Sequence, residues 1–182
     1  MTGGRIASAS IAAVLAFAVR ASDAAPADSL EYAVKATFVY KFAAFVDWPP
    51  AAFGASASPF ELCVVGNDPV AQIIDSVAAG QIAGDRPVTV RHLAAVARDS
   101  GCHILYVAFN GLPAEEALDA VRSAPVLTIT DSVHGGPAHG IISFVVQANR
   151  VRFDIDDAAA AESGLSISSK LLSLARAVRP RP

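Results

Sequence analysis

The residues best placed to do chemistry are four polar side chains that lie within three residues after predicted strands: Asn67, Asp68, Asn110 and Asp131. The carboxyl ends of parallel strands meet at one edge of an α/β sheet, where ligands bind. These residues therefore predict a small polar pocket. The alternative is that they form turns and cap helices, which is the usual role of Asn and Asp at strand ends.

A catalytic role for this region is not supported. Asp131 and Ser132, with His134 or His139, have the residue types of a Ser-His-Asp triad, but the sequence contains no G-x-S-x-G turn to expose the serine. A phospho-acceptor site would need a lysine after a later strand. The chain has three lysines, all in predicted helices: Lys35, Lys41 and Lys170. We therefore expect no catalytic residue.

The sequence also predicts no metal, cofactor or nucleic-acid partner. It has no C-x-x-C pair, and its four histidines do not recur at the i,i+4 spacing that places two ligands on one helix face. The glycine-rich motifs that bind dinucleotides and phosphates are missing. A net charge of −3 with singly scattered arginines provides no basic face for nucleic acid.

The first 24 residues have the pattern of a secretory signal peptide. An apolar run at residues 6–19 follows Arg5 and is shorter than the roughly 20 residues that span a bilayer. Small residues precede Ala25, so we expect cleavage after Ala24, with Ala21 as the second choice. An uncleaved anchor is the alternative. Cleavage would place the mature protein outside the cytoplasm.

Export affects the interpretation of the two cysteines. Thiols oxidise outside the cytoplasm, and a bond between Cys63 and Cys102 would stabilise the fold by at most roughly 4 kcal/mol on the chain-entropy model. Two buried free thiols are the alternative. Bonded cysteines need α-carbons within about 7 Å, so pairing would make the strands at 60–65 and 103–108 neighbours. The strand order would then be 2-1-3-4, as in flavodoxin-like sheets.

Residues 28–46 predict an amphipathic helix, because apolar residues recur at intervals of three and four. Pro49 cannot continue a helix, so we expect this one to end just before Trp48. Trp48 is the only tryptophan of the chain. It either closes one end of the core or lies partly exposed beside Tyr40 as an aromatic contact for a partner.

From residue 60 onward, strand and helix patterns alternate. Strands are expected at 60–65, 87–92, 103–108, 126–130, 141–146 and 151–155, and helices at 69–79, 113–123 and 166–178. This order predicts a single domain over residues 28–178. The predicted fold is a three-layer α/β/α sandwich with a mostly parallel flavodoxin-like sheet and an antiparallel hairpin at its C-terminal edge. The apolar edges of that hairpin would permit a homodimer.

The order of these segments resembles the YfiR-like family of periplasmic proteins from about residue 31 to residue 178. The stretches that carry the resemblance are EYAVKATFVYKFAAFVDWP, FELCVVGNDPV, RPVTVRHL, GCHILYVA, PVLTITDS and GIISFVVQANRVRFDIDDAAAAESGLSISSKLLSLARAV. The resemblance implies a regulator of cyclic di-GMP signalling, and hence of biofilm formation. Such a regulator represses a membrane-bound diguanylate cyclase by binding its periplasmic sensor region. A peptidoglycan-associated outer-membrane lipoprotein can sequester it.

The resemblance also has implications for individual residues. It implies a disulfide between Cys63 and Cys102, without a second bridge because no further cysteine is present. It favours the core-closing role for Trp48. We therefore expect a periplasmic inhibitory binding protein that is not an enzyme. The alternative is a periplasmic domain that binds a small molecule through the loops of Asn67, Asn110 and Asp131.

Overall fold

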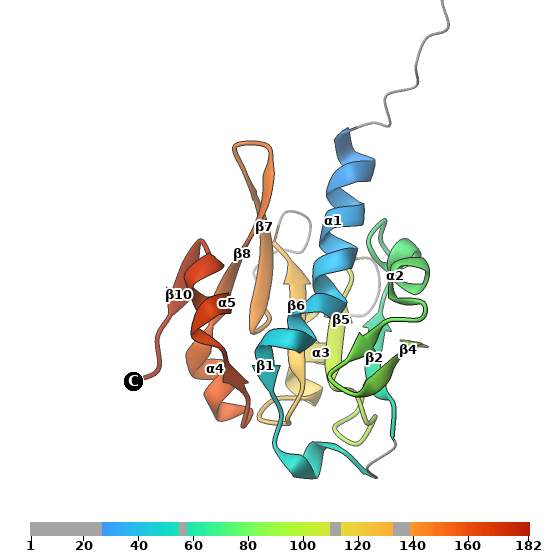
Figure 1. Cartoon of the computed structure of the whole chain (residues 1–182), viewed down its shortest axis with the longest axis vertical. Helices are drawn as coiled ribbons and strands as arrows, with labels where there is room; N and C mark the ends of the chain where they lie inside the picture. Colours follow the sequence, from blue (N-terminus) through green and yellow to red (C-terminus); the bar gives the residue numbers. More distant parts are fainter. Residues whose placement is uncertain (1–26, 55–57, 110–113, 133–138) are drawn as a thin grey trace, which may run out of the picture.

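The computed structural model describes residues 27–54, 58–109, 114–132 and 139–182 (Figure 1). The predicted signal peptide at 1–24 and the candidate residues Asn110 and His134 lie outside these ranges. The elements in chain order are α1 (Ala27–Lys41), the 3-10 turn η1 (Phe42–Phe45), β1 (Val46–Asp47), the 3-10 turn η2 (Pro50–Ala52), β2 (Phe60–Val65), α2 (Ala71–Ala78), β3 (Ile82–Ala83), β4 (Arg86–Leu93), β5 (Ile104–Val107), α3 (Ala114–Ala120), β6 (Leu127–Asp131), β7 (Ile142–Gln147), β8 (Arg150–Asp156), α4 (Asp157–Glu162), β9 (Ser166–Ile167), α5 (Ser169–Leu174) and β10 (Ala177–Arg179). No helix in the described ranges is both long enough and apolar enough to span a membrane.

Within the described residues, eight strands form the main sheet in the order β10-β8-β7-β6-β5-β2-β4-β3. The five strands from β4 to β7 in this order are parallel, and β8 runs antiparallel to β7. The predicted order 2-1-3-4 corresponds to β4-β2-β5-β6 and is confirmed. Strands β2, β5 and β6 are almost entirely buried, which explains their continuous apolar and β-branched runs.

Helices cover both faces of this sheet. On one face α1 and α2 pack over Ile104 and Tyr106 of β5, in the larger of the two cores. On the opposite face α3 packs over Leu105 and Val107, in a smaller core that contains both cysteines. The alternation of side chains along β5 thus separates two layers, and the predicted α/β/α sandwich is confirmed.

The first helix is shorter than predicted. α1 ends at Lys41, the chain tightens into η1, and the two-residue strand β1 begins at Val46. β1 pairs with β9, which lies about 120 residues later in the sequence. This pairing takes the chain out of the helix before Pro49 is reached, so proline chemistry alone did not set the end of the helix.

The C-terminal segment also differs from the prediction. The expected helix over 166–178 is replaced by β9, the short helix α5 and β10. α5 begins only at Ser169 because the hydroxyl of Ser168 accepts a hydrogen bond from the backbone N–H of Leu171. The helical spacing of the apolar residues was therefore misleading, since β9 and β10 pair with strands distant in sequence.

β7 and β8 form the predicted antiparallel hairpin, but β10 covers part of its outer edge. β10 pairs in parallel with residues 154–156 of β8, and Arg176 forms an ion pair with Asp154. On the other side, β6 pairs with β7 only at residues 142–144. The tip of the hairpin therefore extends beyond its neighbours and runs beside α1 (Figure 1).

Candidate functional site

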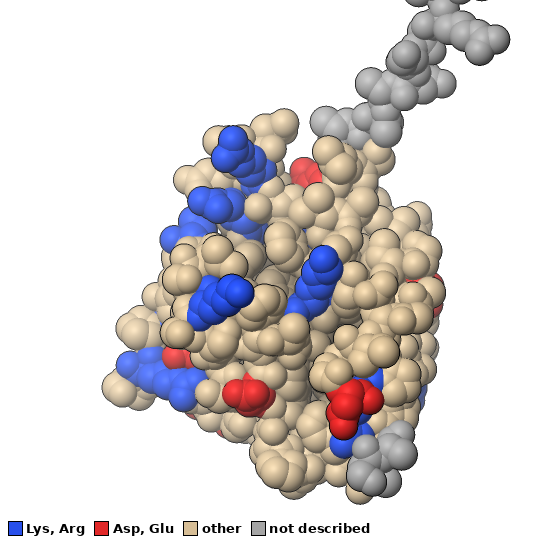
Figure 2. Space-filling model, in the orientation of Figure 1, with Lys and Arg blue, Asp and Glu red and all other residues tan. Residues whose placement is uncertain are grey.

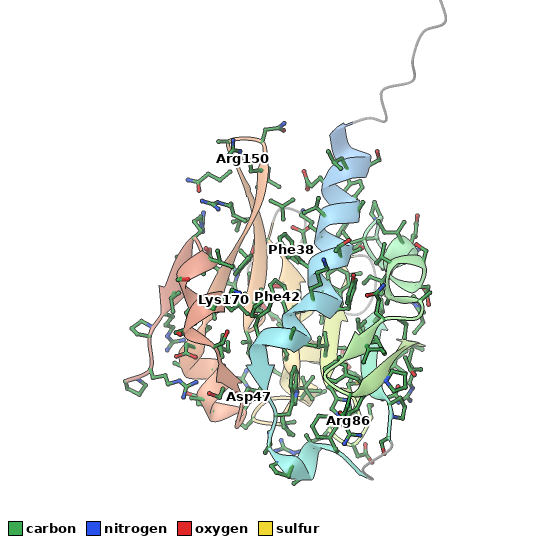
Figure 3. The ribbon with its side chains drawn as sticks, viewed as in Figure 1. Phe38, Phe42, Asp47, Arg86, Arg150 and Lys170 are labelled. Atoms are coloured by element: carbon green, nitrogen blue, oxygen red, sulfur yellow. A yellow bond between two sulfur atoms is a disulfide. The ribbon has the colours of Figure 1, made fainter. Side chains whose placement is uncertain are left out.

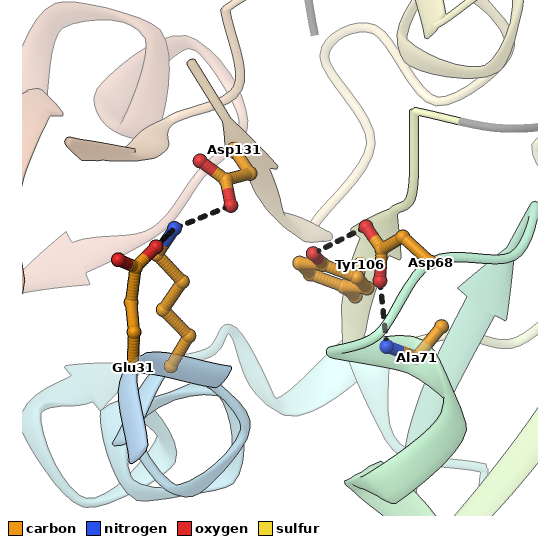
Figure 4. A network of polar contacts seen from close by, with 6 residues as sticks. Glu31, Asp68, Ala71, Tyr106 and Asp131 are labelled. Carbon is orange, nitrogen blue, oxygen red and sulfur yellow. Dashed lines mark hydrogen bonds and ion pairs between the residues drawn. The ribbon is translucent and has the colours of Figure 1, made fainter. Parts of the chain in front are cut away.

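A buried lysine joins α1 to the carboxyl end of the sheet. The Nζ of Lys35 donates hydrogen bonds to Glu31 Oε1 and to Asp131 Oδ2, both at 2.6 Å (Figure 4). Lys35 is fully buried, and Asp131, the last residue of β6, is also buried. A buried ammonium group needs such partners because an unpaired charge loses several kcal/mol of hydration. This ion pair fixes α1 over β6.

A second buried pair lies beside it, at the carboxyl ends of β2 and β5. The hydroxyl of Tyr106 donates to Asp68 Oδ2 at 2.8 Å, and the backbone N–H of Ala71 donates to Asp68 Oδ1 at 2.7 Å. Both oxygens of Asp68 are thus occupied. Burial raises the pKa of the Tyr106 phenol, and the adjacent carboxylate of Asp68 raises it further. Tyr106 therefore stays protonated and remains a hydrogen-bond donor.

These five residues form what we call the carboxyl-end network: Glu31, Lys35, Asp68, Tyr106 and Asp131. The carboxylates of Asp68 and Asp131 are buried, that of Glu31 is partly exposed, and each charged group is held by a partner within the fold. A small ligand at this edge would have to displace Lys35 or Tyr106 from its carboxylate. The arrangement suits a structural lock that holds α1 and α2 on the sheet.

The structure brings together two of the four predicted pocket residues. Asp68 and Asp131 belong to the carboxyl-end network, and Asp68 acts at the start of α2 as the cap that the alternative interpretation proposed. Asn67 is exposed, and its Oδ1 accepts a long hydrogen bond of 3.4 Å from Gln72. Asn110 lies outside the described residues, so its place relative to the network stays a prediction.

Sequence reasoning missed Lys35 because it set aside every lysine that lies in a helix. For Lys35 that reasoning was wrong, since α1 passes over the end of β6 and the long side chain reaches Asp131. The sequence did contain an indication: Lys35 precedes Val39 and Phe42 by four and seven residues, and both of these are buried. That spacing places Lys35 on the buried side of the helix. Glu31, one turn earlier, completes the pairing.

Cys63 and Cys102 form a disulfide, and their α-carbons lie 5.7 Å apart. Cys63 belongs to β2, and Cys102 lies just before β5. Both are buried in the smaller core, where α3 covers them. The structure therefore contains the bond that the family resemblance implies, and this bond joins the two strands that the predicted order placed side by side.

Trp48 lies at the amino end of the central strands. Its ring packs edge-on against Phe60, with centroids 5.0 Å apart, and its Nε1 donates to the backbone carbonyl of His103 at 3.2 Å. These internal contacts agree with the core-closing interpretation. Tyr40 lies in the last turn of α1, and no aromatic contact between it and Trp48 is found in the described part of the chain. A contact of either residue with a partner stays a prediction.

His103, next to Trp48, is enclosed by aromatic rings. It stacks on Phe53 and Phe60, with centroid distances of 4.5 and 4.9 Å. Its Nδ1 accepts a hydrogen bond of 2.9 Å from the backbone N–H of Glu61, which requires the neutral imidazole. Burial lowers the pKa of His103, and the nearby guanidinium of Arg86 acts in the same direction. His103 is thus a structural, neutral histidine near neutral pH.

Among the described residues, no group of three His, Cys, Asp or Glu side chains is arranged to hold a metal ion. The family model described as YfiR/HmsC-like matches residues 32–176, which include the last two thirds of α1 and every later element through α5. The search of curated proteins found no match.

Proposed function

The chain belongs to the YfiR/HmsC-like family, and on that premise we propose that it inhibits a membrane-bound diguanylate cyclase by binding the periplasmic sensor region of that enzyme. Membership of the family indicates a periplasmic regulator of diguanylate cyclase signalling rather than a catalyst. In our proposal the domain lowers cyclic di-GMP when it is bound. A peptidoglycan-associated outer-membrane lipoprotein relieves this inhibition by sequestering it.

The geometry of the carboxyl-end network supports a binding function. Asp68 and Asp131, the two carboxylates best placed for chemistry in this type of sheet, are buried and already bound by Tyr106 and Lys35. Neither of these two carboxylates is therefore free to act on a substrate at this edge. Regulation through the protein surface needs only a stable domain, which the network permits because each of its buried charges has a partner.

The disulfide supports the proposed compartment. Structural disulfides form and persist outside the cytoplasm, whereas cytosolic thiols are kept reduced. The Cys63–Cys102 bond is buried and joins two central strands. Thiol titration of the mature protein from its native compartment should find no free sulfhydryl. N-terminal sequencing of the same sample should begin at Ala25 or Ser22 if the predicted signal peptide is cleaved.

The proposal is tested by deleting the gene in its native strain and measuring cyclic di-GMP. We expect the level to rise severalfold and to return when the full chain is restored. A chain without residues 1–24 should stay in the cytoplasm and fail to restore it. Inactivating the target cyclase should abolish the rise. An unchanged cyclic di-GMP level in the deletion strain, with the cyclase expressed, would contradict the proposal.

A physical test identifies the partner directly. The tagged mature domain, incubated with detergent-solubilised envelope, should retain an inner-membrane diguanylate cyclase that mass spectrometry identifies. The same domain after reduction and alkylation of Cys63 and Cys102 serves as a control for correct folding. Retention of the lipoprotein without any cyclase would leave the inhibitory step without support.

A further inference from the structure

α1 has two apolar sides rather than one. Ala36 and Val39 lie on the side that faces the sheet and are buried, together with Lys35. A second stripe, which we call the outer stripe, follows the spacing i, i+3, i+4, i+7, i+8, i+11: Leu30, Ala33, Val34, Thr37, Phe38 and Lys41. All but Thr37 and Lys41 are apolar, and the ring of Phe38 also packs against Phe144 and Phe153. Leu30, at its start, is 68% exposed. Helices that are apolar on both sides are normally covered on both sides.

The outer stripe forms one wall of a groove, and the projecting β7–β8 hairpin forms the other. Val34 and Phe38 of α1, with Arg150 and Val151 of the hairpin, line a hollow of about 350 Å³. A second hollow of about 320 Å³ shares the same two α1 residues and extends to Lys41. Figure 3 shows Phe38 between α1 and the hairpin, and Arg150 at the hairpin tip. We call the two hollows together the α1–hairpin groove.

The groove has a basic residue at each end. Lys41 and Arg150 are both exposed, and neither forms an ion pair with any carboxylate of the described residues. Figure 2 shows basic side chains on this face, over the hairpin and around it. Elsewhere, four exposed arginines do have aspartate partners: Arg122 with Asp119, Arg176 with Asp154, Arg179 with Asp156 and Arg181 with Asp157. The acidic residue in the groove, Glu31, is held by Lys35.

We propose that the α1–hairpin groove binds an acidic amphipathic helix in the periplasmic region of the cyclase. This inference rests on the proposed function and names the surface through which the domain binds the cyclase. From Leu30 to Lys41 the outer stripe is about 16 Å long at 1.5 Å per residue, which is three helical turns. The apolar side of the incoming helix covers Val34 and Phe38. Its carboxylates pair with Lys41 and Arg150 at the two ends.

Two other occupants fit the charges less well. A second copy of this chain would bring Lys41 and Arg150 of both copies to one interface, and juxtaposed like charges oppose association. The N-terminal segment of the chain, residues 1–26, has Arg5 and Arg20 but only Asp23 as an acidic residue. It is therefore basic overall and does not complement a basic groove.

Site-specific photo-crosslinking in the native strain tests the surface. A photoreactive phenylalanine analogue is placed at Leu30 in the full exported chain, and the control carries it at Ile82 in β3. Both residues are 68% exposed, so the two positions are matched in accessibility. We expect the Leu30 variant to crosslink an inner-membrane diguanylate cyclase, identified by mass spectrometry, and the Ile82 variant to give at least tenfold less of this product.

Charge reversal tests the ends of the groove. The double variant Lys41→Glu/Arg150→Glu should reduce the Leu30 crosslink at least tenfold and raise cyclic di-GMP towards the level of the deletion strain. Lys170→Glu, which reverses an exposed cation outside the groove, should do neither. The urea midpoint of each purified variant establishes that it is folded, since all three side chains are exposed.

The outcomes separate the groove from the proposed function. If the deletion strain shows raised cyclic di-GMP but the cyclase crosslinks from Ile82 and not from Leu30, the function stands and the groove assignment is overturned. A Leu30 product that contains a second copy of the chain, its own N-terminal segment or the lipoprotein also overturns it. If deletion leaves cyclic di-GMP unchanged, the proposed function fails, whatever the crosslinks show.

Discussion

The inner side of α1 has a buried lysine that is paired with carboxylates, whereas the outer side has an exposed lysine that is not. On the inner side, Lys35 is fully buried and is held by Glu31 and Asp131 at 2.6 Å. On the outer side, Lys41 is exposed and has no carboxylate partner among the residues described. A buried charge must be paired within the fold, whereas an exposed one is already hydrated and remains available to another molecule. One helix thus contributes a buried ion pair on one side and, in our proposal, a binding surface on the other.

The largest effect is expected from removing the inner charge. Lys35→Met should lower the free energy of unfolding by about 3–5 kcal/mol, because it leaves the buried carboxylate of Asp131 without its ammonium partner. Urea denaturation followed by circular dichroism measures the change. Adding Asp131→Asn to this variant should recover part of the loss, since the uncompensated charge is then removed.

The matched control for that experiment is Lys41→Met on the same helix. It removes an exposed, unpaired cation and should change the free energy of unfolding by no more than about 0.5 kcal/mol. If Lys35→Met and Lys41→Met had the same free energy of unfolding, the inner lysine would contribute no more to stability than the outer one.

A smaller loss is expected at the neighbouring pair of the carboxyl-end network. Tyr106→Phe removes the hydroxyl that donates to Asp68 Oδ2 and leaves that buried oxygen without its donor. We expect a loss of about 1–3 kcal/mol in the free energy of unfolding. Tyr40→Phe, which removes the hydroxyl of a partly buried tyrosine outside the network, is the control. A Tyr106→Phe variant as stable as the wild type would mean that Lys35 alone anchors this end of the sheet.

The pH dependence of stability concerns His103, at the amino end of the central strands, and not the carboxyl-end network. The folded state holds His103 neutral with a lowered pKa, whereas an unfolded histidine has a pKa near 6.5, so the unfolded state binds more protons below that pH. The stabilisation from His103 is present above about pH 6.5 and is lost as the pH falls towards the folded-state pKa. In His103→Gln, urea midpoints at pH 7.5 and pH 5 should differ less than in the wild type. If the urea midpoint changed equally between the two pH values in the variant and the wild type, His103 would not be the source of the acid sensitivity.

The smallest effect on stability is expected in the groove. Leu30→Gln replaces an exposed apolar residue by one of similar helix propensity and should change the free energy of unfolding by less than about 0.5 kcal/mol. The same variant should nevertheless raise cyclic di-GMP in the native strain. Ile82→Gln, equally exposed but on β3, should leave both quantities at the wild-type level. A stability loss in Leu30→Gln comparable to that of Lys35→Met would show that the outer stripe belongs to the core.

Several features of the fold follow from local sequence patterns. The strand predicted at 60–65 agrees residue for residue with β2, because a β-branched apolar run bounded by turn residues leaves few other structures. The order of the first four long strands followed from the assumption that two cysteines are bonded, which limits the distance between their strands. The family resemblance, quoted from short segments, agrees with the match over residues 32–176.

Other features depended on residues far apart in the chain. Lys35 and Asp131 are separated by 96 residues, and no local sequence pattern predicts that a lysine in a helix forms an ion pair with a carboxylate at the end of a strand. The C-terminal prediction failed for the same reason, since β9 pairs with β1 and β10 pairs with β8. Hydrophobic spacing alone does not distinguish a short helix from short strands whose partners lie elsewhere.

The sequence by itself determined which segments form the central strands and which family the chain resembles, and through that resemblance the pairing of the two cysteines, because these depend on residue types in short stretches. Only the tertiary structure decided which charges of α1 are buried and which are exposed. The rotation of a helix about its own axis is set by the packing of all its neighbours. A rotation by the angle between two successive residues would change which lysine faces the sheet and which faces solvent.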